Sequence, residues 1–393
     1  MLIWLSFIIA LALIMMIARK SLWIALLVGA VALGIFNLSW KELITVMADT
    51  ISQPDILLLA LAVGLIPLIG GSLQITGLLA DLVDNLQVKR KVFLALSPAL
   101  MGLLPIPGGA LLSAPMLNKA GDDISREHYA AINVWFRHIL ILIYPLGGLL
   151  PCSKMAGLNL YTVILYLLPA FALLFILGYF FFLSDIKGDM PKPNKLNLKK
   201  LLVPLFIVLT APIIHLILSG NGMMNEIALL IGIVISLLLT IIFGKLKPSG
   251  MKKVFLQMKP WKYFLIIIGI FLFLHVFQAS PVSEEISKIA FSKSFLIIVV
   301  GVLLSLATGR VQIPISILIP IFLAAFGANA LTPLAFAIMY VAVYLGYMIS
   351  PVHPCVVVSL EYFGATYKEF VGKLLLPGFI GLLFCYLAAL ILL

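Results

Sequence analysis

The chain has 393 residues, of which 63% are hydrophobic and 10% are charged, and its mean hydropathy is +1.22. A water-soluble domain does not form with so little charge, and successive apolar stretches of about 17 or more residues are typical of membrane spans. The net charge of +11 would suggest nucleic-acid binding in a soluble protein. Here the lysines stand in short loops between apolar segments, so we interpret them as a topology signal and expect no nucleic-acid partner.

Ten apolar segments are predicted to cross the lipid bilayer. In chain order they are residues 2–18, 22–38, 55–72, 129–153, 160–183, 201–218, 226–243, 263–279, 332–360 and 374–392. The first lacks a basic region and a small-residue cleavage site, which predicts a retained span rather than a signal peptide. Residues 40–53 and 247–260 have mixed polarity, which predicts helices lying along the membrane interface.

Two further apolar segments, 92–118 and 294–327, carry Pro and Gly near their middles. The basic residues indicate that both dip into the bilayer and return. If Arg19 and Lys20 are cytoplasmic, 20 of the 26 Lys and Arg fall in inside loops and four in outside loops. Counting either segment as a full span would destroy this positive-inside bias. We therefore predict two re-entrant helical hairpins, with both chain ends outside a prokaryotic cytoplasmic (inner) membrane.

The second half of the chain repeats the first. Three prolines recur at offsets of 205, 206 and 208 residues: Pro115 with Pro320, Pro145 with Pro351, and Pro169 with Pro377. This predicts an all-α integral membrane protein of two repeats, residues 1–190 and 201–393, joined by a cytoplasmic linker at 191–200. Each repeat has five spans and one hairpin, and this odd number of crossings inverts the second repeat. Inverted repeats with interrupted helices are typical of secondary transporters.

The hairpin tips are the first candidate site. In the first tip, LLPIPGGALLSAP at 103–115, Pro107 stops a helix, and Gly108 and Gly109 allow close backbone approach before a new helix that carries Ser113. The N-terminus of that helix would attract an anion. The second tip, ATGRVQIPIS at 307–316, adds Thr308 and Arg310. Because an arginine inside the membrane is costly, Arg310 is a functional-site hypothesis by default.

Two spans are predicted to be broken, at 129–153 and at 332–360. The first break contains Gly147 and Gly148, and the second contains Ser350, Pro351 and His353. Irregular backbone at membrane depth is tolerated only inside protein or beside a wet cavity. The breaks free carbonyl groups that could coordinate a small cation, so we expect ion coupling at Pro107, Gly147, Gly148, Thr308 and Pro351.

Charge favours an anionic substrate. Arg137 precedes the first break by about two turns, and no acidic residue lies in the middle of any predicted span. Arg137 either faces the substrate or clamps the first hairpin to the rest of the protein. His353 is the candidate for protonation coupling. We expect substrate contacts from Gly108, Gly109, Ser113, Arg137, Arg310, Ser350 and His353. The three isolated cysteines indicate neither a disulfide nor a metal site, and we expect no cofactor beyond Na⁺ or H⁺ as coupling ion.

The repeat, the opposed hairpins and the broken spans resemble the ion-transporter superfamily of gluconate, citrate and dicarboxylate carriers. Within it, LLPIPGGALLSAPML, NVWFRHILILIYP and GYMISPVHPCVVVSLEYFGATYKEF are similar to an uncharacterised prokaryotic family of multi-pass membrane proteins, over nearly the whole chain. The resemblance implies a homodimer, an elevator-like moving part and ion coupling at the tips and breaks. Neither tip has the Ser-Asn-Thr signature of the dicarboxylate carriers.

The leading hypothesis is a non-enzymatic, ion-coupled transporter of a small organic anion, with a carboxylate favoured because arginine holds it by two hydrogen bonds. Alternatives are a membrane-embedded hydrolase using His353 and Glu361, and an anion channel on the same scaffold. The chain has no H-E-x-x-H and no G-x-S-x-G motif.

Overall fold

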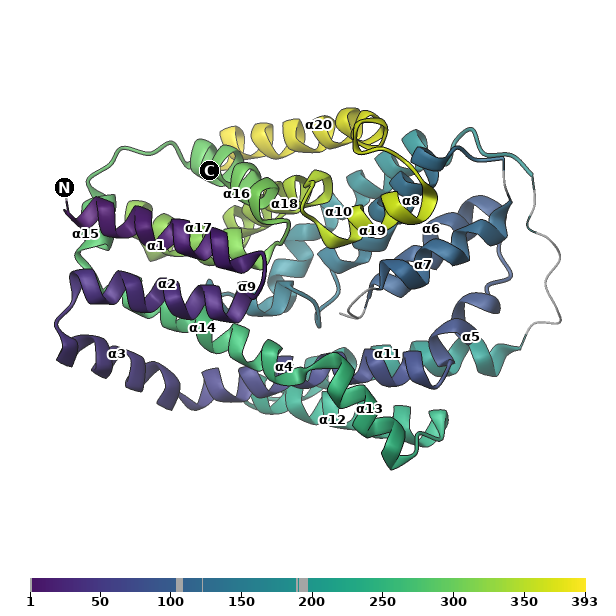
Figure 1. Cartoon of the computed structure of the whole chain (residues 1–393), viewed down its shortest axis with the longest axis horizontal. Helices are drawn as coiled ribbons and strands as arrows, with labels where there is room; N and C mark the ends of the chain where they lie inside the picture. The colour runs from purple at the N-terminus through teal and green to yellow at the C-terminus, as the bar shows by residue number, and fades with distance from the viewer. Residues whose placement is uncertain (1, 104–108, 122, 189, 191–196) are drawn as a thin grey trace.

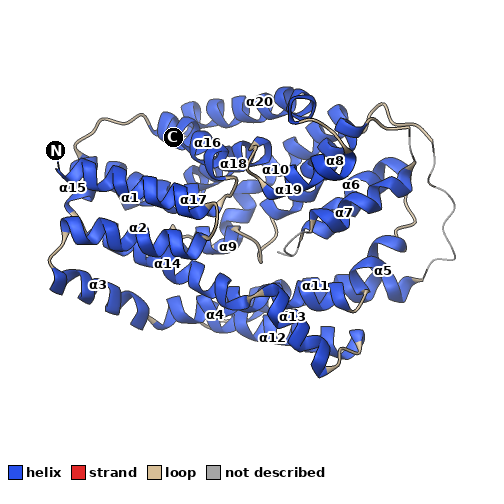
Figure 2. Ribbon diagram, viewed as in Figure 1, coloured by secondary structure: helices blue, strands red, loops and turns tan. Residues whose placement is uncertain are grey.

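The computed structural model describes residues 2–103, 109–121, 123–188, 190 and 197–393. These residues form helices joined by short connections, and no strand occurs among them (Figure 2). The helices of the first half are α1 (Leu2–Ala18), α2 (Leu22–Asn37), α3 (Trp40–Ser52), α4 (Pro54–Ile75), α5 (Leu78–Asp84), α6 (Arg90–Gly102), α7 (Ala110–Leu117), α8 (Arg126–Ile139), α9 (Leu149–Met155) and α10 (Leu160–Phe182).

The second half contains ten more α-helices. They are α11 (Leu198–Gly220), α12 (Asn225–Gly244), α13 (Pro248–Met258), α14 (Pro260–Ala279), α15 (Pro281–Ser287), α16 (Gly301–Thr308), α17 (Gln312–Phe326), α18 (Pro333–Ile349), α19 (Pro354–Phe363) and α20 (Tyr367–Leu392). A π-helical turn at Phe295–Val300 leads into α16. Single 3-10 turns follow α7, α8 and α17, at Asn118–Ala120, Leu140–Leu142 and Ala328–Ala330.

The chain is an all-α, multi-pass integral membrane protein, as its sequence predicts. Among the described residues, seven helical segments are long and apolar enough to cross a bilayer: 54–75, 160–182, 198–220, 225–244, 248–279, 333–363 and 367–392. The apolar helices α1 and α2 are shorter, with 17 and 16 residues. Many large apolar side chains on α10, α11, α12 and α20 are exposed at the surface of the protein. In a membrane these side chains face lipid instead of water.

Both segments that are predicted to be hairpins contain a pair of packed helical arms. The first consists of α6 and α7, and Lys119 at its end pairs with Asp84 at its start, with 2.5 Å between Nζ and Oδ1. The second consists of the π-turn, α16 and α17. Here the Lys293 ammonium, just before the hairpin, lies 5.9 Å from the ring centre of Phe326 at its end. Each segment therefore starts and ends at the same face of the molecule, and Figure 1 shows α6 and α7 on the opposite side from α16 and α17.

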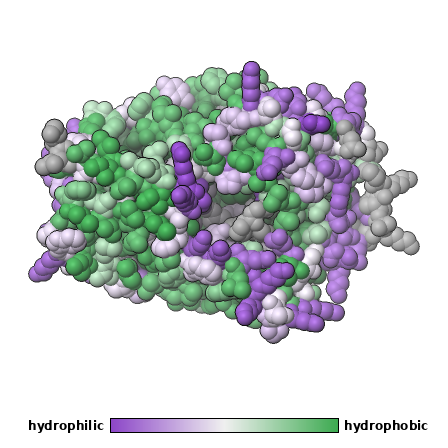
Figure 3. All heavy atoms as spheres, viewed as in Figure 1, coloured by the Kyte–Doolittle hydropathy of each residue, from purple (hydrophilic) through white to green (hydrophobic). Residues whose placement is uncertain are grey.

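Loops predicted to be cytoplasmic meet at one face. Arg90 is an example: its guanidinium pairs with Asp123 and also donates to the carbonyl of Lys187 at 2.6 Å. Bonding to Arg90 lowers the pKa of the exposed Asp123 carboxyl below its ordinary value of 3.8. Lys200 pairs similarly with Asp81 at 2.9 Å. Figure 3 shows hydrophilic residues gathered toward the end of the molecule that carries α5 and the start of α6.

The order of elements in α1–α10 recurs in α11–α20. Each half has two apolar helices, an amphipathic helix (α3 or α13), a long helix, a helix of seven residues (α5 or α15), a hairpin, a broken span and a last long helix. The paired prolines lie at matching places. Pro115 and Pro320 lie inside α7 and α17, and Pro169 and Pro377 lie inside α10 and α20. The short helices α5 and α15 have no counterpart in the predicted list, because seven residues are too few to show a period.

The helices pack mainly into two groups. We call α1–α5 and α11–α15 the frame helices, and α6–α10 and α16–α20 the core helices. The contact between α2 and α14 is repeated by their counterparts in the other half, α12 and α4. In the same way, the contact between α8 and α20 is repeated by α18 and α10. In Figure 1 the frame helices α3, α4, α12 and α13 lie along the lower edge and the core helices lie above them. The most buried segment, 333–363, runs through the core.

Candidate functional site

The second hairpin tip lies directly on the second break. Gly309 ends α16 in the left-handed conformation, with φ +60°, which glycine adopts without strain. A methyl group added there would lie 2.7 Å from the carbonyl carbon of Val352 and 2.8 Å from the backbone nitrogen of His353. The glycine is therefore required twice, for its backbone angle and for this close approach. The second tip and the second break are therefore in contact.

The same tip also reaches the first break. A methyl group on Gly148 would lie 2.7 Å from the side-chain amide nitrogen of Gln312 and 3.8 Å from the hydroxyl oxygen of Tyr340. Gln312 begins α17, and α17 packs on α9, the second part of the first broken span. In the other direction, α7 of the first hairpin packs on α19 of the second broken span. The second tip, both breaks and helix α7 of the first hairpin thus lie close together.

Arg137 joins the first hairpin to the first broken span. Its side chain is buried, and Nη1 donates to the hydroxyl of Ser113 in α7 at 3.3 Å. The approach of the two elements is close, since a methyl group on Gly102 of α6 would lie 1.8 Å from the carbonyl oxygen of Arg137. Arg137 therefore holds the hairpin, and among the described residues no carboxylate pairs with its guanidinium.

Arg310 is a second cation without a counter-ion. It is half-buried, and within the part of the chain that the structure describes it makes no side-chain hydrogen bond and no ion pair. Both Arg310 and Arg137 lie close enough to His353 to interact with it electrostatically. An unpaired guanidinium at membrane depth is unfavourable. The two arginines therefore give this junction a positive charge that the surrounding described side chains do not balance.

Two of the remaining predicted residues, Ser350 and Thr308, lie at the junction. Ser350 is buried and donates to the carbonyl of Leu306 in α16 at 2.7 Å. Thr308 donates to the carbonyl of Leu304 at 2.8 Å, within its own helix. Pro351 is exposed, whereas Gly109 is buried and Gly147 is half-buried. The predicted residues Pro107 and Gly108 lie outside the described residues.

Three aromatic rings gather beside Arg137. The centroids of His353 and Tyr347 lie 3.9 Å apart, and those of His138 and His353 lie 4.8 Å apart. Cys355 adds its sulfur to this cluster, within 4.8 Å of a ring nitrogen of each histidine. His138, Tyr347 and Cys355 are not among the site residues that the sequence predicts. Their only signal was their position next to a predicted break.

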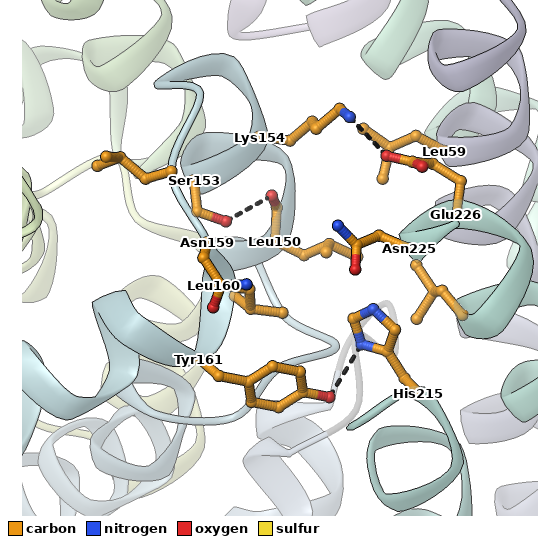
Figure 4. Close-up of a pocket in the computed structure, with 12 residues that line it drawn as sticks. Leu59, Leu150, Ser153, Lys154, Asn159, Leu160, Tyr161, His215, Asn225 and Glu226 are labelled. Carbon is orange, nitrogen blue, oxygen red and sulfur yellow. Dashed lines mark hydrogen bonds and ion pairs between the residues drawn. The ribbon is translucent and has the colours of Figure 1, made fainter. Parts of the chain in front are cut away.

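A separate polar cavity of about 50 Å³ lies where α9 and α10 meet α11 and α12 (Figure 4). Lys154 enters it and pairs with the buried Glu226 at 2.5 Å and with Asp55 of α4 at 3.4 Å. The Tyr161 hydroxyl lies 2.9 Å from Nδ1 of His215, and Nε2 of this histidine has no hydrogen-bond partner in the part of the chain that the structure describes. These contacts join core helices to frame helices, away from the tips and breaks.

Comparison with known proteins identifies a family. Among solved structures, the chain is similar to the YdaH transporter of Alcanivorax borkumensis, with 14% sequence identity, a TM-score of 0.47, and coverage of 94% of this chain and 96% of that one. No curated protein matches the sequence. The family model described as "Protein of unknown function (DUF401)" matches residues 2–392, which is nearly the whole chain. The chain therefore belongs to this family.

Proposed function

We propose that the protein is a secondary transporter of a small organic anion, driven by Na⁺ or H⁺. The observation that carries this proposal is the pair of arginines at the junction of tips and breaks. Arg137 and Arg310 both act on His353, and no described carboxylate neutralises either of them. A bound anion that is not part of the protein would provide the missing negative charge, and a carboxylate would match the planar guanidinium group.

The packing supports alternating access of the elevator type. Hairpins and broken spans all belong to the core helices, which pack mostly among themselves. The frame helices meet them through fewer elements, chiefly α14 and α15 against α17, and α14 against α9. In the proposed mechanism, the core helices carry the bound anion and its coupling ion past the frame helices. The repeated order of elements would give two mirrored open states, which requires the second half to be inverted in the membrane.

The proposal includes the surroundings of the protein. We place it in the cytoplasmic membrane of a prokaryote with both ends outside, since the basic loops that meet around Arg90 would then be cytoplasmic. The exposed apolar faces of the outer helices provide surface for lipid and for a second copy in a homodimer. We propose no catalytic role. The resemblance to the ion-transporter superfamily is consistent with this function and remains part of the proposal.

The test is uptake by the purified protein in liposomes. Labelled carboxylates are offered under an inward Na⁺ gradient, an inward H⁺ gradient or neither, and Arg310→Gln and Arg137→Gln are compared with Arg19→Gln, an exposed arginine at the end of α1. Removing one partner of a buried charge pair costs about 2–5 kcal/mol, which is about 30-fold or more in affinity. We expect that loss for Arg310→Gln and normal uptake for Arg19→Gln.

Three results would contradict the proposal. Undiminished uptake by both junction variants would remove the arginines from the substrate site. Gradient-independent ionic currents far above carrier turnover would indicate an anion channel on the same scaffold. Release of a cleaved product from a lipid or peptide by the wild-type protein, lost on substitution of His353, would indicate the hydrolase.

A further inference from the structure

Two broken spans bring together three side chains whose atoms can ligate a metal ion. His138 lies in the last turn of α8, His353 caps the start of α19, and Cys355 lies in the first turn of α19. One ligand atom from each lies within 4.8 Å of the other two. The cluster joins the first half of the chain to the second, because residues 138 and 353 belong to different repeats.

His353 is the observation that points to a ligand. Its side chain is 1% exposed, and neither ring nitrogen has a hydrogen-bond partner among the described residues. The carbonyl of Tyr347 lies near the ring but outside hydrogen-bond geometry. Leaving a buried polar atom unsatisfied costs about 1–3 kcal/mol. A metal ion bound to one of the ring nitrogens would satisfy a group that is otherwise unfavourable at this depth.

His138 has the tautomer of a metal ligand. Its Nδ1 lies 2.6 Å from the carbonyl oxygen of Val134, one turn earlier in α8. A carbonyl can only accept, so Nδ1 carries the proton and Nε2 presents a lone pair. Metal-binding histidines almost always have their second nitrogen held in this way by a carbonyl or carboxylate. The backbone of α8 thus fixes the tautomer that metal binding requires.

We propose that His138, His353 and Cys355 bind a divalent transition metal ion, with zinc as the best fit. Two imidazoles and a thiolate are ligands that zinc takes, at about 2.0–2.1 Å for nitrogen and about 2.3 Å for sulfur. A tetrahedron with those bond lengths separates two nitrogens by about 3.3 Å and a nitrogen from the sulfur by about 3.6 Å. The three ligand atoms lie within 4.8 Å of one another, so binding one ion requires them to approach by about 1 Å. Three protein ligands leave the fourth position to water or an anion.

The thiolate is essential to this site. The guanidinium groups of Arg137 and Arg310 both lie near His353 and oppose a cation. Two neutral imidazoles would not offset that repulsion, whereas a thiolate supplies a negative charge. Cys355 is well placed to do so, because the first turn of a helix favours a negative group. Substituting Cys355 should therefore abolish binding, rather than weaken it as loss of one neutral ligand would.

The experiment measures metal binding by the purified full-length protein, prepared without a histidine tag. The chain offers matched controls, since Cys152 and Cys385 are buried cysteines outside the cluster. The double variant Cys152→Ser/Cys385→Ser keeps only the cluster thiol, and Cys355→Ser removes only that one. Each protein is equilibrated with Zn²⁺ and freed of excess ion for a metal count. Each is also titrated with Co²⁺, because a thiolate bound to cobalt absorbs in the near ultraviolet.

We expect one Zn²⁺ per chain and a thiolate–cobalt band in the wild type and in the double variant. Cys355→Ser should lose the band, and His353→Gln should bind at least tenfold more weakly, since even outer-shell changes cost about 10–100-fold. A wild-type protein that retains no metal would overturn the proposal, as would a band that survives in Cys355→Ser. The result does not depend on transport, so failure here leaves the anion-carrier proposal standing, and the reverse also holds.

Discussion

The contact between Gly309 and the second break gives a quantitative prediction. Gly309→Ala places a methyl group 2.7 Å from the Val352 carbonyl carbon, and it also puts alanine at a φ of +60°. The left-handed backbone costs about 1–2 kcal/mol. The clash with backbone atoms that cannot rotate away adds about 1–3 kcal/mol. The free energy of unfolding should therefore fall by about 2–5 kcal/mol in total.

Gly364 provides a matched control. It ends α19 as Gly309 ends α16, with φ +67° and ψ +33° against +60° and +29°. A methyl group there would meet only the Arg126 guanidinium, at an ordinary 3.6 Å. Gly364→Ala should therefore cost only the backbone term of about 1–2 kcal/mol. Both variants would be unfolded reversibly in mixed micelles with rising denaturing detergent. Equal destabilisation by the two would refute the close contact between the second tip and the second break.

Two further predictions concern charges away from the junction. Lys154→Met should lower the free energy of unfolding by about 1–3 kcal/mol, because it leaves Glu226 buried without its partner, and adding Glu226→Gln should restore most of the loss. A single variant as stable as the wild type in the same micelle titration would show that this pair is not formed. The lowered pKa of Asp123 stabilises the fold above the ordinary value of 3.8, and this contribution is lost as pH falls through the lower folded pKa. Asp123→Asn should therefore have a lower melting temperature than the wild type at neutral pH, and its melting temperature should fall less on acidification. If the melting temperatures of the two proteins change in parallel with pH, this would argue against the Arg90 bond.

The sequence determined the membrane fold through features that act locally. Span length follows from bilayer thickness, so the apolar runs alone place α10, α11 and α12 within a few residues. Proline lacks an N–H and ends or bends helices, which located both breaks. The bias of Lys and Arg distinguished hairpins from full spans, and the pairs at Lys119 and Lys293 agree with it. Each of these signals is contained in about 20 neighbouring residues.

The composition of the site was decided only by tertiary structure. Ser113 and Arg137 are 24 residues apart, yet they share a hydrogen bond because α7 folds back on α8. The three cysteines are isolated from one another in the sequence, and His353 two residues before Cys355 is too short a pattern to predict a metal site. His138 and Cys355 lie close together because the broken spans of the two halves come together in the folded protein. The close contacts at Gly102 and Gly309 are possible because glycine has no side chain. They also depend on how four separate elements are arranged in space, which no local sequence pattern encodes.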